Sequence, residues 1–317
     1  MHLPRRSLLG LFAASSAWAQ SFPERPVRLV VPRAPGGGSD NLARVFAGPL
    51  GLRLGQSVVI ENKPDATAVL GAELVAHARA DGHTLYLADN SFYQNPAVIG
   101  ALPYDTLRDF SGVTMLAEAP VVLLLNPAVP ARNLAELVAY AKANPGKLSY
   151  ASGGVGASTH LAGVQFNLAA GIETLHVPFR SSGPAVTALL SRQVDMQYGG
   201  MSSARQLIET GQVRAVAVTG GRREPAIPDV PTFAQAGFAG VDITSIWGLH
   251  APAATPMGPR RAMRDAIAAT FAEPEVAARL SQLGFTPLVT TPEAHQRATE
   301  ELVARWIEIG KRVNLKE

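Results

Sequence analysis

The 317-residue chain contains no cysteine. This absence excludes disulfide bonds, thiolate metal sites, cysteine nucleophiles and a lipid-modified N-terminal cysteine. The histidines offer no replacement as metal ligands, since no two of the seven stand at the helical spacing that binds a metal ion. We therefore expect a protein that needs neither a metal nor another cofactor.

Long apolar runs, long basic runs and common catalytic motifs are missing as well. Beyond the N-terminal region no run of about eighteen apolar residues occurs, so we expect a soluble mature chain. The lack of a Lys/Arg run argues against a nucleic-acid partner. Gly-x-Ser-x-Gly, the P-loop motif and a complete Gly-x-Gly-x-x-Gly are all absent. We therefore expect that the protein is not an enzyme. The alternative is a hydrolase or isomerase of organic acids whose active site is assembled from residues distant in the sequence.

The N-terminal segment, residues 1–19, predicts export. Arg5 and Arg6 precede a short apolar run, and Ala17-Trp18-Ala19 fits the small-x-small cleavage rule. We expect cleavage after Ala19 and a periplasmic mature protein. The paired arginines fit both the twin-arginine and the general secretory route, so both stay open. Cleavage removes two arginines and no acid, which leaves 26 basic against 25 acidic residues.

Strand patterns alternate with helix patterns along the chain, and the length suits two domains. This alternation predicts an α/β protein with parallel-rich sheets covered by helices on both faces. Pro49 should kink or end the first helix. We expect strands at 27–31, 58–60, 84–88, 121–125, 148–151, 176–177, 194–198 and 213–218. We expect helices from 39, over 70–80 and 134–143, from 158, and over 184–190, 263–271, 274–283 and 292–313.

Two Gly-rich loops, residues 35–40 and 152–159, each follow a strand and open a helix. Glycines let a ligand approach the backbone closely, and a helix N-terminus adds free N–H donors and partial positive charge. Both loops therefore predict an anion site. An ordinary loop with a capping side chain is the alternative in each case. Because the phosphate-loop and dinucleotide motifs are missing, carboxylates or small oxyanions are the expected anions.

Short sequence segments along the chain, taken in order, resemble those of the Bug-type solute receptors of tripartite tricarboxylate transporters. The resemblance runs from Phe22 to Lys316. The strings that carry it are residues 25–32, 35–40, 43–44, 54–56, 61–64, 81–85, 102–105, 143–148, 228–232 and 248–252.

The resemblance implies a type II periplasmic binding protein fold, with two lobes, two crossing strands and a ligand cleft between the lobes. One lobe would take residues 22–122 and 245–317, and the other residues 123–244. A ligand carboxylate would be held by the two Gly-rich loops, often through waters. The residues expected to face it are Gly38, Ser39 and Asp40 from one lobe and Ser152, Gly156, Ser158 and Thr159 from the other. Asn90, Ser91 and Asp195 are further candidates, and a structural capping role is the alternative for Asp195.

Three departures from the family pattern concern the expected site. Arg33 stands where an aromatic residue is usual, residues 65–69 replace a Gly-rich stretch, and Trp247 lies one position later than expected. Arg33 follows the first strand, so its guanidinium could pair with a second anionic group of the ligand and select diacids. The alternative is a side chain that lies along the loop with its charge in solvent.

We expect from this a monomeric receptor that closes its lobes on a small organic acid and delivers it to the membrane permease subunits of a tripartite transporter. A receptor of the same fold that docks on a signalling partner is the alternative. The sequence does not identify the acid.

Overall fold

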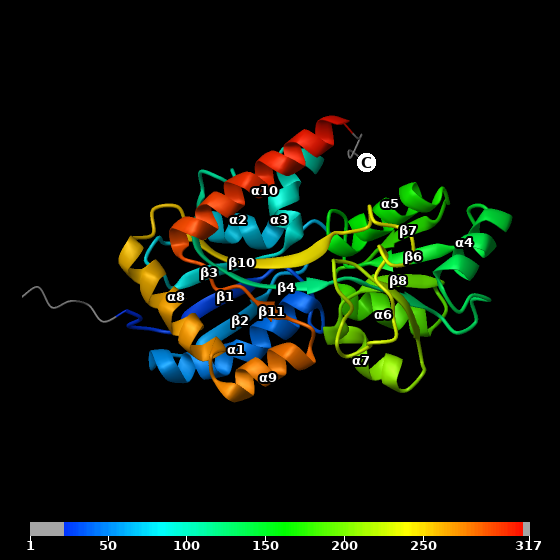
Figure 1. Ribbon diagram of the computed structural model, residues 1–317. Helices are drawn as coiled ribbons and strands as arrows, with labels where there is room; N and C mark the ends of the chain where they lie inside the picture. Colours follow the sequence, from blue (N-terminus) through cyan, green and yellow to red (C-terminus); the bar gives the residue numbers. More distant parts are fainter. Residues whose placement is uncertain (1–21, 313–317) are drawn as a thin grey trace, which may run out of the picture.

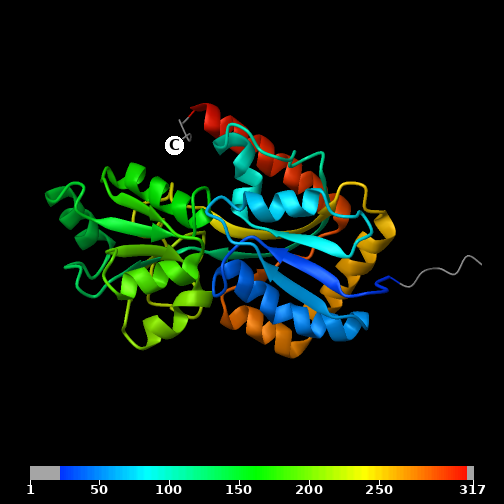
Figure 2. The same ribbon diagram turned by 180° about the vertical axis from the view of Figure 1, so that it is seen from behind.

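The computed structural model describes residues 22–312 and contains two β-sheets side by side, each covered by helices (Figures 1 and 2). The predicted export signal lies outside the described residues. Among those residues, no helix is both long enough and apolar enough to span a membrane.

Lobe 1 is built on a six-stranded mixed sheet with the order β11-β4-β10-β3-β1-β2. β1 pairs in parallel with β2 and β3, whereas β10 is antiparallel to β3 and β4. The strands are β1 (Val27–Val31), β2 (Val58–Asn62), β3 (Thr84–Ala88), β4 (Phe110–Pro120), β10 (Thr244–Pro252) and β11 (Thr286–Pro287). The helices are α1 (Gly38–Leu54), α2 (Val69–Ala76), α3 (Asn90–Val98), α8 (Met257–Phe271), α9 (Pro274–Gln282) and α10 (Pro292–Arg312).

Lobe 2 is built on a five-stranded mixed sheet with the order β7-β6-β8-β5-β9. β6 is parallel to β7 and β8, and β5 is antiparallel to β8 and β9. The strands are β5 (Val122–Leu125), β6 (Ser149–Ser152), β7 (Leu175–Pro178), β8 (Met196–Gly199) and β9 (Arg214–Val218). The helices are α4 (Leu134–Ala143), α5 (Ser158–Ala170), α6 (Ser182–Leu190) and α7 (Met201–Glu209). The expected α/β class is confirmed, but the sheets are mixed rather than parallel-rich, because the crossing segments of the chain add antiparallel strands to both.

The chain crosses between the lobes from β4 to β5 and returns between β9 and β10 (Figure 1). At the crossing Val121 donates its N–H to Thr219 Oγ1, and Thr219 donates its N–H to the Val121 carbonyl, both at 2.8 Å. These bonds tie the two passages together. The chain passes from the lobe 1 sheet to the lobe 2 sheet between Pro120, the end of β4, and Val122, the start of β5. The exact lobe boundaries stay a prediction.

Several strands lead into a helix, and five of these pairs matter for the site: β1 and α1, β3 and α3, β6 and α5, β7 and α6, and β8 and α7. The helices begin at the carboxyl ends of their strands, which is the edge where open α/β sheets bind ligands. The first two belong to lobe 1 and the other three to lobe 2, so both lobes bring helix N-termini to the space between them.

Three features differ from the sequence predictions. Pro49 does not end α1, which runs to Leu54 and stops where Gly55 takes the left-handed conformation with φ 67°. No helix was predicted after the strand at 84–88, yet α3 begins there, because the Asp89 side chain accepts the Ser91 N–H and caps the helix. The long crossing strand β4 and helix α7 were not predicted.

A buried polar cluster lies in the core of lobe 1. His250 on β10 and His295 on α10 bring their Nε2 atoms within 3.1 Å, and the Tyr93 hydroxyl lies 3.3 Å from His250 Nε2. Burial lowers the pKa of His295 to about 3, although a hydrogen bond to the main chain of Leu249 opposes the shift. Burial, followed by the neighbouring His295, also places the pKa of His250 well below its usual range. Both imidazoles are therefore neutral in the folded protein near pH 7.

Candidate functional site

A cavity of about 50 Å³ lies between the lobes, walled by residues of both. Direct contacts join the lobes around it. Arg33 donates from Nη1 to the Gly153 carbonyl at 3.0 Å, and the Ala34 N–H donates to the Arg180 carbonyl at 3.3 Å. Asn41 Nδ2 donates to the Ser202 carbonyl at 3.2 Å. These contacts hold the two lobes together around the cavity.

The N-termini of five helices contribute residues to the cavity wall. α1 and α3 come from lobe 1, and α5, α6 and α7 from lobe 2. The residues at these helix starts are Gly38 and Ser39, Asp89 and Asn90, Ala157 to Thr159, Ser181 and Ser182, and Gly200 to Ser202. Each helix N-terminus carries partial positive charge and N–H groups without an intrahelical partner. Their convergence makes the cavity attractive to an anion.

Four of the five helix starts make no side-chain capping bond. The N-cap residues Gly37, Ala157, Ser181 and Gly200 contribute no such bond to α1, α5, α6 and α7. Only α3, with Asp89 as its N-cap, has one among these five. At the other four starts a ligand can take the place that a capping side chain usually occupies.

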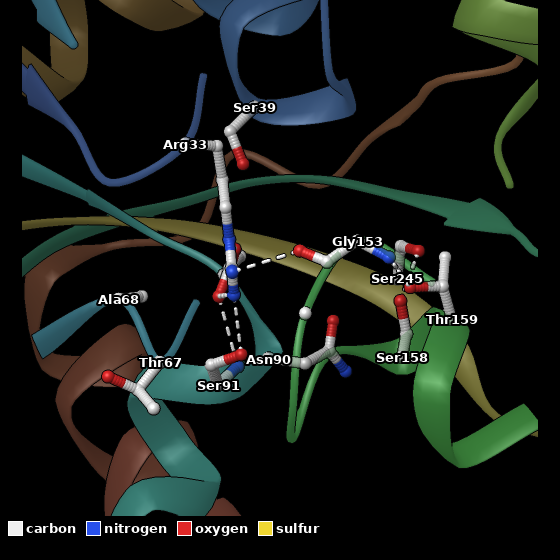
Figure 3. A network of polar contacts seen from close by, with 12 residues as sticks. Arg33, Ser39, Thr67, Ala68, Asn90, Ser91, Gly153, Ser158, Thr159 and Ser245 are labelled. Atoms are coloured by element: carbon white, nitrogen blue, oxygen red, sulfur yellow. Dashed lines mark hydrogen bonds and ion pairs between the residues drawn. The ribbon is translucent and has the colours of Figure 1, made fainter. Parts of the chain in front are cut away.

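Arg33 and Asp89 form a buried ion pair at the wall, with the Arg33 side chain 4% exposed. Figure 3 shows the Arg33 side chain extending toward Ser91, with Gly153 of lobe 2 beside it. Arg33 Nε donates to Asp89 Oδ2 at 2.6 Å, and Nη2 donates to Asp89 Oδ1 at 3.2 Å and to Ser91 Oγ at 2.6 Å. Nη1 donates to the carbonyls of Gly153 at 3.0 Å and Ala66 at 3.2 Å. Acceptors within the protein are therefore present for all five guanidinium N–H groups.

The position of Arg33 differs from both sequence hypotheses. Its charge is not in solvent, and its donors are directed to protein acceptors rather than to the second anionic group of a ligand. Burial acts to lower the pKa of Arg33, yet the charge and hydrogen bonds of Asp89 raise it overall. Arg33 and residues 65–69 are both departures from the family pattern. They contact each other, because Arg33 Nη1 donates to the Ala66 carbonyl.

Three predicted hydroxyl residues line the cavity and have partners in the protein. Trp247 Nε1 donates to Ser39 Oγ at 2.9 Å. Ser158 Oγ and Ser245 Oγ lie 2.6 Å apart and join the lobes, and the Gly153 N–H donates to Thr159 Oγ1 at 2.9 Å. Gly38 also lines the cavity, and a Cβ at this position would lie 2.9 Å from the Trp247 ring. Asn90 binds the β10 main chain at Thr244 and Ile246.

Five predicted residues lie outside the cavity wall. Asp40 is 1% exposed, and its carboxylate binds its own loop and helix. It accepts from the Gly36 N–H at 3.0 Å and from Arg44 Nε at 2.8 Å. Burial opposes the ionised form, yet these bonds lower the pKa of Asp40. Ser91 is buried and supports Arg33. The Gly156 N–H donates to His160 Nδ1 at 3.2 Å.

Ser152 and Asp195 complete this group of residues. Ser152 is fully buried, with Oγ 2.7 Å from His176 Nε2. This Ser–His contact resembles a nucleophile–base pair, but its hydroxyl is closed off from the cavity. Burial, followed by the neighbouring His160, lowers the pKa of His176 to about 3. Asp195 accepts from the Ser149 N–H at 2.8 Å, at the end of β6 away from the cavity, so the capping alternative describes it.

The sequence analysis missed the hydroxyl residues at the starts of α6 and α7, together with Ser245. Ser181 is the most informative, because it lines the cavity, is 2% exposed and its Oγ has no hydrogen-bond partner among residues 22–312. A buried hydroxyl without a partner is costly unless a ligand or water binds it. The signal was present: the strand predicted at 176–177 is followed by Ser181-Ser182-Gly183, and the strand predicted at 194–198 is followed by Gly199-Gly200, each beside a helix start.

Glycines permit the close approach of the lobes. A Cβ on Gly37 would lie 2.8 Å from Ser181 Cβ in the opposite lobe. A Cβ on Gly183 would lie 3.1 Å from the Pro35 carbonyl oxygen, and one on Gly154, with φ 131°, would lie 2.4 Å from the Ala66 carbonyl oxygen. Any side chain at these positions would hold the lobes apart.

No group of three or more His, Cys, Asp or Glu side chains that could hold a metal ion occurs in the described part of the chain. The chemistry of the site is therefore that of helix N-termini, hydroxyls and one neutralised ion pair.

Comparison with known proteins gives a consistent assignment. The profile of the family described as "Tripartite tricarboxylate transporter family receptor" matches residues 42–315. A UPF0065 protein from the tcbD-tcbE intergenic region of Pseudomonas sp. (strain P51) is 37% identical over 309 residues, covering 95% of this chain and 92% of that protein.

Two solved structures are similar over nearly the whole chain. Periplasmic binding protein BugD has 34% identity and a TM-score of 0.89, covering 93% of this chain and 100% of that one. R. palustris Rpa4515, solved with adipate, has 31% identity and a TM-score of 0.88, covering 92% of this chain and 97% of that one. The chain therefore belongs to the Bug-type receptors of the tripartite tricarboxylate transporter family.

Proposed function

We propose that this protein is a periplasmic receptor that captures a small organic acid by its carboxylate between the two lobes. The observation that carries the proposal is the convergence of five helix N-termini on one interlobe cavity. The adipate held by the R. palustris relative supports carboxylates as the ligand class.

The described donors can supply the required affinity. A hydrogen bond to a charged group contributes about 1.5–3 kcal/mol, and a micromolar complex needs about 8 kcal/mol net. Backbone N–H groups of the uncapped helices, together with the Ser39 and Ser181 hydroxyls, are the proposed donors. Gly38, Ser158 and Thr159 shape the wall beside them. No cationic side chain needs to be exposed to the ligand in this arrangement.

Capture is proposed to occur by lobe closure about the two crossings near Val121 and Thr219. The moving bodies would be residues 22–122 with 245–317, and residues 123–244. The ligand contacts both lobes only when they are together, so its binding energy favours the closed state. The contacts of Arg33 with Gly153 and of Ser158 with Ser245 would break on opening.

The closed, loaded monomer is proposed to deliver its ligand to the permease subunits of a tripartite transporter. A signalling receptor would use the same site, and affinity purification from native membranes separates the two roles. Recovery of permease subunits supports transport, and recovery of a sensor protein would support signalling.

The ligand can be identified by native mass spectrometry of the protein purified from its own periplasm. A released carboxylic acid is the expected result, and calorimetry should then give the same affinity with and without EDTA. Loss of binding on chelation would contradict the proposed site chemistry. Conversion of the acid during incubation would indicate an enzyme.

A further inference from the structure

The loop between β6 and α5 offers two main-chain carbonyls to lobe 1. Arg33 Nη1 donates to the Gly153 carbonyl at 3.0 Å, and Ser91 Oγ donates to the Val155 carbonyl at 3.5 Å. Figure 3 shows the Arg33 side chain beside Gly153, with the bond between them drawn. Both donors lie in lobe 1 and both acceptors in lobe 2, so these bonds exist only while the lobes are together. We call this pair of contacts the latch.

Lobe 1 holds Arg33 in place independently of lobe 2. The Nε and Nη2 atoms of Arg33 bind Asp89, and Nη1 also donates to the Ala66 carbonyl at 3.2 Å. Asp65 fixes the turn that presents this carbonyl, since it accepts main-chain N–H groups at 2.7 and 2.8 Å. Among the described residues, Gly153 is the one acceptor of Arg33 that lies in lobe 2. Opening therefore breaks one bond of Arg33 and leaves its charge neutralised by Asp89.

The loop fits against lobe 1 because Gly154 has no side chain. A Cβ at this position would lie 2.7 Å from Arg33 Nη1. The residue that Arg33 binds also holds the helix start behind it, since the Gly153 N–H donates to Thr159 Oγ1 at 2.9 Å. Thr159 lines the cavity at the N-terminus of α5. A ligand bound at this helix start and the latch therefore act on the same loop, and each stabilises the loop position that the other requires.

From this arrangement we infer that Arg33 is a positioning residue, which together with Ser91 latches the lobe 2 loop in the closed state and slows ligand release. The Arg33 N–H groups have acceptors in the protein, so the latch should slow the release of every captured acid by the same factor. The inference rests on the proposed function, because it assumes that the lobes close on a carboxylate. It goes further in assigning the lifetime of the closed state to a residue that departs from the family pattern. A phenylalanine at this position would have no donor for the Gly153 carbonyl.

Stopped-flow measurements on the mature protein separate the rate of capture from the rate of release. Trp247 lines the cavity, so its fluorescence reports occupancy, and the test acids are adipate and the acid released from the native protein. Arg33→Lys keeps a positive charge beside Asp89 but lacks the planar fork that binds Asp89 and Gly153 together. We expect dissociation to become at least about tenfold faster for both acids, the effect of losing one hydrogen bond to a charged group. Association should change by less than about twofold, because the latch forms only after the lobes meet.

Ser91→Ala tests the second contact and leaves the Arg33–Asp89 pair in place. It should speed dissociation by about two- to tenfold, the range for one neutral hydrogen bond. Arg28→Lys is the matched control, because Arg28 lies on β1 and pairs with Glu61 of β2 within lobe 1. This control should change neither rate. If Arg33→Lys does not fold, Ser91→Ala decides the test on its own.

The outcomes separate the latch from the receptor function. Unchanged dissociation in the deciding variant, an equal effect of Arg28→Lys, or a matching change in association would overturn the latch and leave the carboxylate receptor standing. Faster release of one acid alone would show that Arg33 acts on that ligand, and would overturn the latch too. If only one of the two acids binds the parent, its rates decide. Absence of binding by both acids would overturn the proposed function and the inference together.

Discussion

Gly37 of lobe 1 and Ser181 of lobe 2 approach so closely that a Cβ on Gly37 would lie 2.8 Å from the Ser181 Cβ. Gly37 has φ −84° and ψ 171°, a conformation that alanine adopts without strain. Its lack of a side chain is therefore needed for the contact between lobes and not for the local backbone.

Gly37→Ala should weaken ligand binding at least tenfold while leaving the thermal stability of the unliganded protein nearly unchanged. The added methyl group acts only when the lobes are together, so it penalises closure. Calorimetry and small-angle scattering with saturating ligand provide the measurements. Gly48→Ala is the matched control, because a Cβ at this helical position meets no atom within 4 Å. A normal affinity in Gly37→Ala would contradict the closed arrangement of the lobes.

Breaking the Arg33–Asp89 pair should destabilise the fold. Removal of one partner of a buried ion pair costs about 3–5 kcal/mol, since it leaves an uncompensated charge. Arg33→Met and Asp89→Asn should each lower the free energy of unfolding measured in urea by an amount in this range. The double variant should lose less than the sum of the two single losses. Strict additivity would show that the pair is not coupled.

Arg33→Phe restores the aromatic residue usual in the family and tests the diacid hypothesis directly. Because the guanidinium N–H groups already have protein acceptors, we expect equal changes in affinity for a matched diacid and monoacid. A selective loss of diacid binding would return Arg33 to a role in ligand pairing.

Ser181→Ala should lower affinity by about 1.5–3 kcal/mol, the contribution of a hydrogen bond to a charged group. The unliganded protein should not lose stability, because the Ser181 hydroxyl has no partner among the described residues. Ser39→Ala and Thr159→Ala should weaken binding by about 1 kcal/mol or more. Ser191→Ala, at the other end of α6, is the control. Unchanged affinity in Ser181→Ala would remove this residue from the site.

Stability should fall as the pH drops below about 6.5, the ordinary pKa of an unfolded histidine. His250 and His295 are neutral in the folded protein because burial lowers their pKa values, for His295 to about 3. The unfolded chain therefore binds more protons between about pH 6.5 and 3, and the stabilisation present above pH 6.5 is lost across this window. Each histidine contributes about 1.4 kcal/mol per pH unit at most. His295→Gln should flatten the urea-unfolding profile; an unchanged slope would contradict this account.

The parts of the site that the sequence predicted best are the two helix starts that follow the Gly-rich loops. The two Gly-rich strings gave the helix starts at Gly38 and Ser158 because glycine in a strand-to-helix loop signals close approach. The start at Ser182 follows Phe179-Arg180-Ser181, which contains no glycine, and the start at Met201 follows the Gly199-Gly200 pair, which the sequence analysis did not single out. Ser181 could have been found by following the repeated pattern through the second half of the chain.

The remaining misses arise from long-range contacts. Asp40 was expected to face the ligand because it follows the loop, but Gly36, Arg44 and Asn62 draw its carboxylate back into lobe 1. Nothing local to Arg33 identifies Asp89, 56 residues away, as its partner. β4 mixes glycine, serine and glutamate with apolar residues, and its pairing with β10 supplies the order that its own pattern does not.

The interlobe anion site is formed by backbone N–H groups at helix N-termini, and these groups do not titrate in water. The positive ends of the five helices persist at any acidity that leaves the backbone folded, and the one guanidinium at the wall stays charged, since its ordinary pKa lies far above neutral and Asp89 raises it further. Acidification should therefore weaken capture only through the ligand, once its own carboxylate begins to protonate. Any loss of capture at milder acidity would report loss of the fold through His250 and His295 and not a change at the helix N-termini.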